Sequence, residues 1–205
     1  PFVAVMSSGN SPARAKMLKD LGAEVVLVPQ VDGTEGKVTG NDVRRADEVA
    51  RKVSKERKAY FVNQFHNPNC IAAHYQTTGP EIFAALGNQI DYFVACVGSA
   101  GSFVGIAKFL KEHVPHIQCI AVEPESCSVL AGKPQISSQH VIQGTGYSIV
   151  PPHWDKTLCD GFISVSDESV QQMKAVLGSK EGLCVGFSAA ANVVAASRVL
   201  QDSQT

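Results

Sequence analysis

Hydrophobic residues along the chain follow two alternating patterns. Short apolar runs rich in β-branched residues are typical of strands that are buried on both faces of a parallel sheet. Longer segments place an apolar residue at every third or fourth position, as amphipathic helices do. The short runs predict strands at 2–6, 25–28, 60–65, 91–97, 119–122 and 162–165. The periodic segments predict helices at 12–21, 41–57, 72–76, 80–86, 103–114, 167–177 and 189–200.

This alternation predicts the fold class. Strands that alternate with helices are typical of an α/β fold in which open, mostly parallel sheets are flanked by helices. A chain of 205 residues is long enough for one large domain or two small ones. The stretch 124–156 carries neither pattern, so we expect an irregular segment there.

Polar residues at the starts of the predicted helices indicate where those helices are capped. A Ser, Asn or Asp side chain at such a position accepts a hydrogen bond from a backbone N–H of the first turn. The expected caps are Ser11, Asn41 and either Ser166 or Asp167. Ser188 stands where the last helix begins, so its position alone predicts an N-cap as well.

The charge and the reactive side chains exclude several classes of function. With 18 basic and 19 acidic residues the net charge is −1, which provides no basic surface for nucleic acid. The six cysteines have no CxxC spacing and the six histidines have no HxxxH or HxH spacing, so we expect no metal site. Most of the cysteines lie in apolar runs, which indicates core thiols in a reducing compartment.

The ends of the chain and its apolar runs bear on its location. No apolar run reaches the length of about 18 residues that a membrane-spanning helix needs. The chain opens within a predicted strand and carries no signal peptide, so we expect its natural start to lie upstream. We therefore expect a cytoplasmic protein, or an organellar one whose transit peptide lies upstream.

The segment VGSAGSFVGIAKFLK at 97–111 places small residues between a predicted strand and a predicted helix. Small residues let the backbone approach a ligand closely, and the first N–H groups of a helix favour an anion. The hydroxyls of Ser99 and Ser102 favour a bound phosphate over a tight turn that binds nothing. The turn is neither a Walker loop, because no lysine follows its last glycine, nor a GxGxxG motif.

Five segments, taken in order, together resemble one family of enzymes. They are NQFHNPNCIAAHYQTTGPEIFAAL, VGSAGSFVGIAKFLK, AVEPESCSVLAGKP, HVIQGTGY and EGLCVGFSAAANVVAA. With them the chain resembles the cysteine synthase and cystathionine β-synthase family, whose members are pyridoxal 5'-phosphate (PLP) enzymes of fold type II, similar in fold to the tryptophan synthase β-subunit. The resemblance implies two domains: residues 1–64 as the remainder of a small, substrate-side domain, and residues 65–205 as a larger domain that binds the cofactor's phosphate.

The resemblance also implies which residues hold the cofactor's phosphate. The family's turn GTGGT corresponds here to Gly98, Ser99, Ala100, Gly101 and Ser102. Both hydroxyl positions are kept as serine, whereas Ala100 replaces a glycine. We expect this replacement to cost energy if residue 100 adopts a positive φ angle.

Four further positions match family residues. Ser188 matches the serine that hydrogen-bonds the pyridine nitrogen, and a neutral hydroxyl does not force the ring to be protonated as a carboxylate would. Gln64 matches a glutamine that contacts the substrate carboxylate, or it is a polar residue at the end of a strand. Gly144 and Gly146 match glycines that line the pocket opposite the ring, or they simply form a turn. No catalytic residue is carried over.

Two parts of the family's site have no counterpart in this chain. They are the lysine that forms the Schiff base with PLP and the Asn- and Thr-bearing loop that holds the substrate. We expect 7–10 to be a different loop at the mouth of the site, and Lys156 and Lys180 to be solvated. The resemblance therefore implies an N-terminally truncated chain that is inactive by itself.

For the whole protein, the resemblance implies a β-replacement on O-activated L-serine by sulfide or another thiol, which makes L-cysteine. The partners would be the amino-acid substrate, the thiol and a second copy of the chain in a homodimer. A different class of function is also open, that of a catalytically inactive, sulfhydrylase-like protein that senses a metabolite or binds a partner. Among enzymes, a cystathionine β-synthase-like enzyme and a β-eliminating dehydratase are the nearest rivals to a cysteine synthase.

Overall fold

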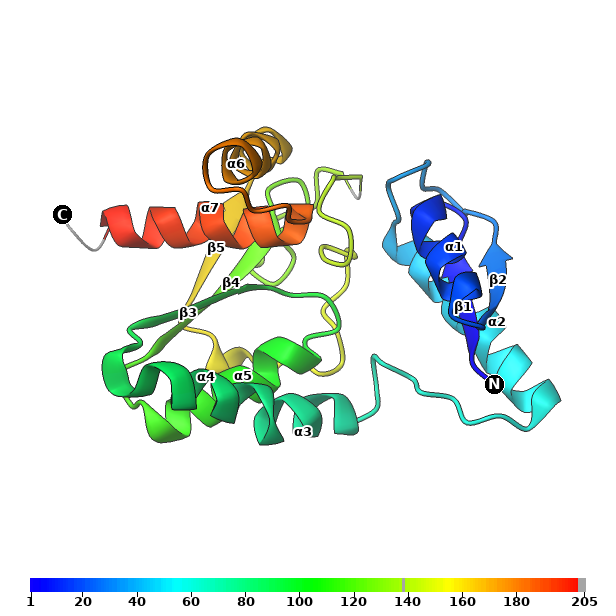
Figure 1. Cartoon of the computed structure of the whole chain (residues 1–205), viewed down its shortest axis with the longest axis horizontal. Helices are drawn as coiled ribbons and strands as arrows, with labels where there is room; N and C mark the ends of the chain where they lie inside the picture. The colour runs from blue at the N-terminus through cyan, green and yellow to red at the C-terminus, as the bar shows by residue number, and fades with distance from the viewer. Residues whose placement is uncertain (138, 203–205) are drawn as a thin grey trace.

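A computed structural model of the chain describes residues 1–137 and 139–202. These residues form two separate parallel sheets, each with its own helices (Figure 1). The arrangement confirms the predicted α/β fold class. No helix in these two ranges is long and apolar enough to cross a membrane.

The N-terminal sheet has two strands, β1 (Val3–Ser7) and β2 (Glu24–Val28). The strands are parallel, with Val3 opposite Glu24 and Ser7 opposite Val28. Helix α1 (Pro12–Asp20) connects them, and α2 (Gly40–Arg57) follows β2 and packs against β1 (Figure 1). The carboxyl end of β1 and the start of α2 lie on the side of this part that faces the second sheet, since Ser7 and Val43 line one cavity with Cys96 of β3.

Thr39 caps α2, so the expectation that Asn41 does so is wrong. The Thr39 hydroxyl accepts a hydrogen bond from Asp42 N at 3.3 Å, and the Asp42 carboxylate accepts one from Thr39 N at 2.9 Å. This reciprocal pair is a capping box, which satisfies two backbone donors at once. Asn41 instead lies inside the first turn, where its side chain donates to Asp32 at 2.7 Å.

Residues 58–68 connect the two sheets and contain no strand, so the strand expected at 60–65 is wrong. The side chains of Tyr60 and Val62 are 78% and 52% exposed. The segment has the β-branched and aromatic composition of a strand, but it crosses between the sheets, where no neighbouring strand pairs with it (Figure 1).

The second sheet has three parallel strands in the order β3, β4, β5. Their bounds are Tyr92–Cys96, Gln118–Pro124 and Gly161–Val165. One face is covered by α3 (Asn69–Gln76), α4 (Thr78–Leu86) and α5 (Gly101–His113), and the other by α6 (Asp167–Lys180) and α7 (Phe187–Asp202) (Figure 1). Two single turns of 3₁₀ helix, η1 (Gly87–Gln89) and η2 (Lys156–Leu158), complete the elements.

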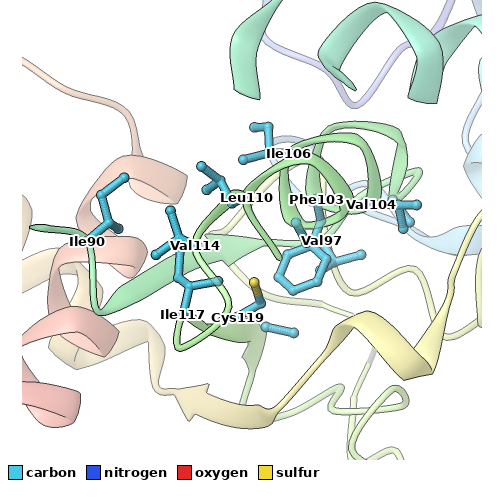
Figure 2. Packing of buried hydrophobic residues seen from close by; sticks show 12 residues of the cluster. Ile90, Val97, Phe103, Val104, Ile106, Leu110, Val114, Ile117 and Cys119 are labelled. Atoms are coloured by element: carbon cyan, nitrogen blue, oxygen red, sulfur yellow. The ribbon is translucent and has the colours of Figure 1, made fainter. Parts of the chain in front are cut away.

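Alternate residues of the strands face two separate hydrophobic clusters. On one face Phe93 and Cys119 pack with α5, whose Phe103 and Leu110 have no exposed surface. Figure 2 shows Cys119 beneath Phe103 and Leu110 in this cluster. On the other face Val94, Cys96 and Val122 pack with α6 and α7. The strands are covered on both faces by apolar residues. This explains why their apolar runs in the sequence are continuous, as the pattern predicted.

The structure also decides the remaining caps. Ser166, not Asp167, caps α6, since its hydroxyl accepts a hydrogen bond from Ser169 N at 3.2 Å. Ser11 holds the N-cap position of α1 without a side-chain hydrogen bond. Ser188 is the second residue of α7, whose first backbone hydrogen bond runs from Ala190 N to the Gly186 carbonyl. The N-cap expected at Ser188 is therefore wrong, and its hydroxyl is not used in capping.

Candidate functional site

A cavity of about 590 Å³ lies between the two sheets. Pockets for small molecules have volumes of about 300–1,000 Å³, so a cofactor-sized molecule fits. From the N-terminal part, Ser7 lines it at the end of β1, Asn10 from the loop that follows, and Val43 from α2. The C-terminal part contributes the turn after β3, the loop 143–147 and the start of α7.

The small-residue turn between β3 and α5 forms part of the cavity wall. Gly98, Ser99 and Ser102 line the cavity, while Ala100 is only 2% exposed. Ala100 occupies the N-cap position of α5 in the left-handed conformation, with φ +69° and ψ −8°. The residue that replaces a family glycine therefore has the positive φ that a side chain disfavours.

The start of α5 presents backbone donors beside this turn. The first backbone hydrogen bond of the helix runs from Val104 N to the Ala100 carbonyl at 2.9 Å. The N–H groups ahead of Val104 have no partner within the helix, and the helix dipole adds positive potential there. Gln64, which also lines the cavity, donates from Nε2 to Ser99 Oγ at 3.4 Å. Its own backbone carbonyl accepts a hydrogen bond from His153 Nε2 at 3.2 Å.

Two predicted glycines lie on the loop that faces this turn. A Cβ atom added to Gly98 would lie 2.3 Å from the carbonyl oxygen of Gly144, so the two backbones meet closely. Gly144 lines the cavity and has a φ of +94°. Gly146, with φ +59°, lies outside the cavity lining, where an added Cβ would be 2.7 Å from His140 Nε2. The structure thus brings Gly144, but not Gly146, to the cavity surface.

His140 supports this loop from behind. Its Nε2 donates to the Gly146 carbonyl at 3.3 Å, and its Nδ1 has no partner among the residues that the structure describes. Burial lowers the pKa of His140 below its usual value, although the hydrogen bond to Gly146 opposes that shift. The side chain is therefore a neutral imidazole near neutral pH.

The α7 side of the cavity is built on two residues one helical turn apart. Ser188 and Asn192 both line the cavity. Asn192 Oδ1 accepts a hydrogen bond from Cys96 N at 2.8 Å, and the Cys96 thiol donates to the Ser188 carbonyl at 3.7 Å. Burial raises the pKa of Cys96 to about 12, so this thiol stays protonated. The contacts join the end of β3, just before the turn, to the start of α7.

The sequence reasoning missed Asn192 and further cavity residues, among them Gln143 and Tyr147. Asn10 also lines the cavity, and it belongs to the loop 7–10 that we expected at the mouth of the site. Gln143 also donates from Nε2 to the Gly36 carbonyl at 2.6 Å, which ties the loop to the N-terminal part of the chain. The spacing of Asn192 four residues after Ser188 is a signal that could have revealed it, since such residues share a helix face. No comparable signal marks Gln143 or Tyr147.

The electrostatic character of the cavity is neutral. Its lining within the described part of the chain contains no Asp, Glu, Lys, Arg or His. An anion bound there would be held by hydroxyls, amides and backbone N–H groups, together with the dipole of α5. Among the described residues the lining also contains no nucleophilic lysine, and Lys156 and Lys180 are exposed elsewhere.

Comparison with known proteins identifies the class. A family model described as pyridoxal-phosphate dependent enzyme matches residues 1–205. The chain belongs to this family of PLP-dependent enzymes, whose members use pyridoxal phosphate as their cofactor. Its curated relatives include a cysteine synthase from Helicobacter pylori (strain ATCC 700392 / 26695), 36% identical over 191 residues, which are 93% of this chain and 59% of the relative. Cysteine synthase 3 from Caenorhabditis elegans is 37% identical over 194 residues, which are 95% of this chain and 55% of the relative.

Solved structures show the same relationship. An O-acetylserine dependent cystathionine β-synthase from Helicobacter pylori has a TM-score of 0.83 and 34% identity, over 98% of this chain and 62% of that one. A hydrogen sulfide-producing enzyme from Fusobacterium nucleatum has a TM-score of 0.84 and 34% identity, over 98% of this chain and 63% of that one. The predicted family and fold type are confirmed, and the chain spans 55–59% of the length of the two curated relatives.

The residues of the cavity fit PLP. The phosphate of PLP is an anion, and the turn of Gly98 to Ser102 offers hydroxyls, helix N–H groups and a close backbone approach. The heteroaromatic ring needs an uncharged, partly apolar cavity, which the lining residues Val43, Phe65 and Cys96 help to provide.

Proposed function

We propose that the chain is the cofactor-binding part of a cysteine synthase-type enzyme. The whole protein would replace the O-linked group on the β-carbon of an activated L-serine with sulfide or another thiol, giving L-cysteine. The observation that carries the proposal is that the serine-bearing turn before α5 and Ser188 of α7 line one cavity. The identity of the relatives as cysteine synthases supports it.

In this proposal Gly98, Ser99, Ala100, Gly101 and Ser102 hold the phosphate of PLP. The two hydroxyls and the N–H groups at the start of α5 donate to it, and the helix dipole compensates its charge without any cationic side chain. Ala100 and Gly101 of the turn are buried, which holds the neighbouring donors in place and limits the conformational freedom that is lost when they bind the phosphate.

Ser188 contacts the ring nitrogen, and its neutral hydroxyl leaves that nitrogen unprotonated. PLP, when bound, withdraws electrons from the α-carbon of an amino acid, which allows a group on the β-carbon to leave. Gln64, held to Ser99, would orient the substrate carboxylate, and Gly144 would form the wall opposite the ring. Gly144 keeps a side chain away from the space that the substrate needs, whereas Gly146 lies behind this wall and would shape it through its contact with His140.

The proposal includes the division of the chain and its behaviour in isolation. Residues 1–64 belong to the substrate-side domain and residues 65–205 to the domain that holds the phosphate. No lysine lines the cavity among the described residues, so the chain supplies neither a covalent anchor for PLP nor a lysine base. It therefore binds PLP but turns over no substrate alone. The whole protein would act as a homodimer.

An absorbance titration of the 205-residue chain with PLP tests the proposal. It is followed by borohydride reduction and mass mapping of any modified lysine. We expect saturable binding with no single labelled lysine. An absence of saturable binding would refute the cofactor site, and specific labelling of one lysine would refute the claim that the chain lacks the covalent anchor.

Matched serine variants locate the phosphate. Ser102→Ala removes a hydroxyl that the proposal places on a charged group, which is worth about 1.5–3 kcal/mol, or roughly ten- to a hundredfold in affinity. Ser179→Ala changes an exposed serine of α6 and is the control. Equal PLP affinities of the two variants would contradict the assignment of the phosphate to the turn.

A further inference from the structure

Asn192 presents an amide group of fixed orientation to the cavity. Its Oδ1 accepts the hydrogen bond from Cys96 N at 2.8 Å. A backbone N–H can only donate, so the atom that it meets must be the amide oxygen. Nδ2 is then the other end of the same amide, and it makes no hydrogen bond to any residue that the structure describes. Its two protons are therefore available to a molecule in the cavity.

Asn192 and Ser188 present their polar groups to the same space. They lie four residues apart on α7, so they share one face of the helix, and both line the cavity. The Ser188 hydroxyl makes no hydrogen bond within the described chain; only its backbone carbonyl does, from the Cys96 thiol. A ligand on this side of the cavity thus meets a hydroxyl and an amide NH₂.

Cys96 gives this arrangement its rigidity. Its backbone N–H binds Asn192 and its thiol binds the Ser188 carbonyl, so one residue at the end of β3 is attached to both positions on α7. Gly98, at the start of the turn, lies two residues further along the chain. Asn192 therefore helps to set the separation between the turn and the start of α7.

Resting on the proposed function, we propose that Asn192 is a second residue for the ring nitrogen of PLP, and that its Nδ2 donates toward that nitrogen beside Ser188. A nitrogen that accepts a hydrogen bond from a neutral amide keeps its lone pair and stays unprotonated. A carboxylate at the same place would favour the protonated ring. Asn192 thus adds to the preference of Ser188 for an unprotonated ring nitrogen, and it fixes the position of Ser188 through Cys96.

The variant Asn192→Asp tests this role, because it keeps an oxygen for Cys96 N and replaces the NH₂ with a carboxylate oxygen. The measurement is the ring ¹⁵N chemical shift of ¹⁵N-labelled PLP bound to the chain, followed against pH. We expect the midpoint of ring protonation to rise by about one pH unit or more in the variant, since an opposite charge in contact shifts a pKa by about 1–3 units. This corresponds to at least a tenfold change in the protonation equilibrium.

The control adds the same charge at a distance. Asn88→Asp lies in η1, on an exposed residue outside the cavity lining, and we expect its midpoint to equal that of the wild-type chain. Binding of the phosphate is followed separately by the ³¹P signal of PLP. If Asn192→Asp binds PLP and its midpoint of ring protonation equals that of the wild-type chain, this inference is overturned and the proposed function stands. A wild-type chain that binds no PLP would overturn both.

A second measurement uses the wild-type chain only, so it does not depend on whether a variant folds. The side-chain ¹⁵N–¹H₂ resonances of Asn192 are followed in the wild-type chain with PLP and, separately, with inorganic phosphate. We expect PLP to shift them and phosphate to leave them unchanged, because phosphate occupies only the turn. Resonances that do not move at saturating PLP, or that move equally with phosphate, would show that the amide does not face the ring.

Discussion

The close approach of Gly98 to Gly144 makes a sharp prediction about the cavity wall. In Gly98→Ala the new Cβ would lie 2.3 Å from the Gly144 carbonyl oxygen, about 0.7 Å closer than real Cβ atoms come to a neighbour. The oxygen belongs to the backbone and cannot rotate away. The loop that carries it is held by Gln143, which donates to the Gly36 carbonyl at 2.6 Å. The substitution must therefore push the turn and the loop apart.

The cost of this movement resembles that of overpacking a core, about 1–3 kcal/mol in the free energy of unfolding. Urea unfolding of the chain, compared at constant m value, measures it. We also expect weaker PLP binding, because the turn that is displaced carries Ser99 and Ser102.

Gly178→Ala is the matched control for this prediction. Gly178 lies inside α6, and an added Cβ would meet nothing within 4 Å. Alanine is a better helix former than glycine, so we expect this variant to gain up to about 1 kcal/mol. If Gly98→Ala proved as stable as the wild-type chain and bound PLP equally well, the close contact between the two segments would be refuted.

Three further predictions concern single residues. In Ala100→Gly, glycine tolerates the left-handed backbone, which raises the free energy of unfolding by about 1–2 kcal/mol. Loss of the buried methyl group lowers the free energy of unfolding by about 0.8 kcal/mol, and the greater freedom of the unfolded chain lowers it by about 0.4–1 kcal/mol. We therefore expect a net change in unfolding free energy below about 1 kcal/mol by urea unfolding, and a loss above about 2 kcal/mol would contradict this reasoning. Burial lowers the pKa of His140 from 6.5, so the unfolded chain takes up its proton at a higher pH than the folded one, and stability falls as the pH drops below 6.5. His140→Gln should flatten this part of the stability–pH curve, and equal slopes for the two chains would count against the assignment. Iodoacetamide at mildly alkaline pH should label the exposed Cys184 well before the partly buried Cys96, whose pKa is about 12, and equal labelling in peptide mass maps would show that the α7 side of the cavity opens in solution.

The local pattern of the sequence was sufficient for most of the secondary structure. The apolar runs at 91–97 and 119–122 and the periodic segment between them correspond to β3, β4 and α5, because burial on both faces of a sheet and on one face of a helix leaves a direct pattern in the chain. The run at 60–65 shows the limit of this reasoning. It has the composition of a strand, yet pairing requires a neighbour, and none lies beside it.

In the candidate site, too, some residues could be predicted from the sequence and others could not. The turn at 98–102 could be found from the sequence, because the need for small residues and hydroxyls beside a helix start is local. Ser188 was found as well, but its expected capping role was wrong, since the helix begins at Phe187, two residues earlier than its pattern suggested. Asn192 was missed, because an asparagine inside a helix has no distinguishing mark until its partner is known.

By itself, the sequence therefore determined the alternation of strands and helices, the position of the small-residue turn and, through the order of its motifs, the resemblance to PLP-dependent enzymes. These properties depend on neighbours within a few residues along the chain. Only the tertiary structure decided that Asn192 meets Cys96, 96 positions away, that Gly98 meets Gly144, and that Ala100 adopts a positive φ. Such contacts depend on how the sheets and helices pack, because side chains from distant segments fill one cavity only after the chain has folded around it.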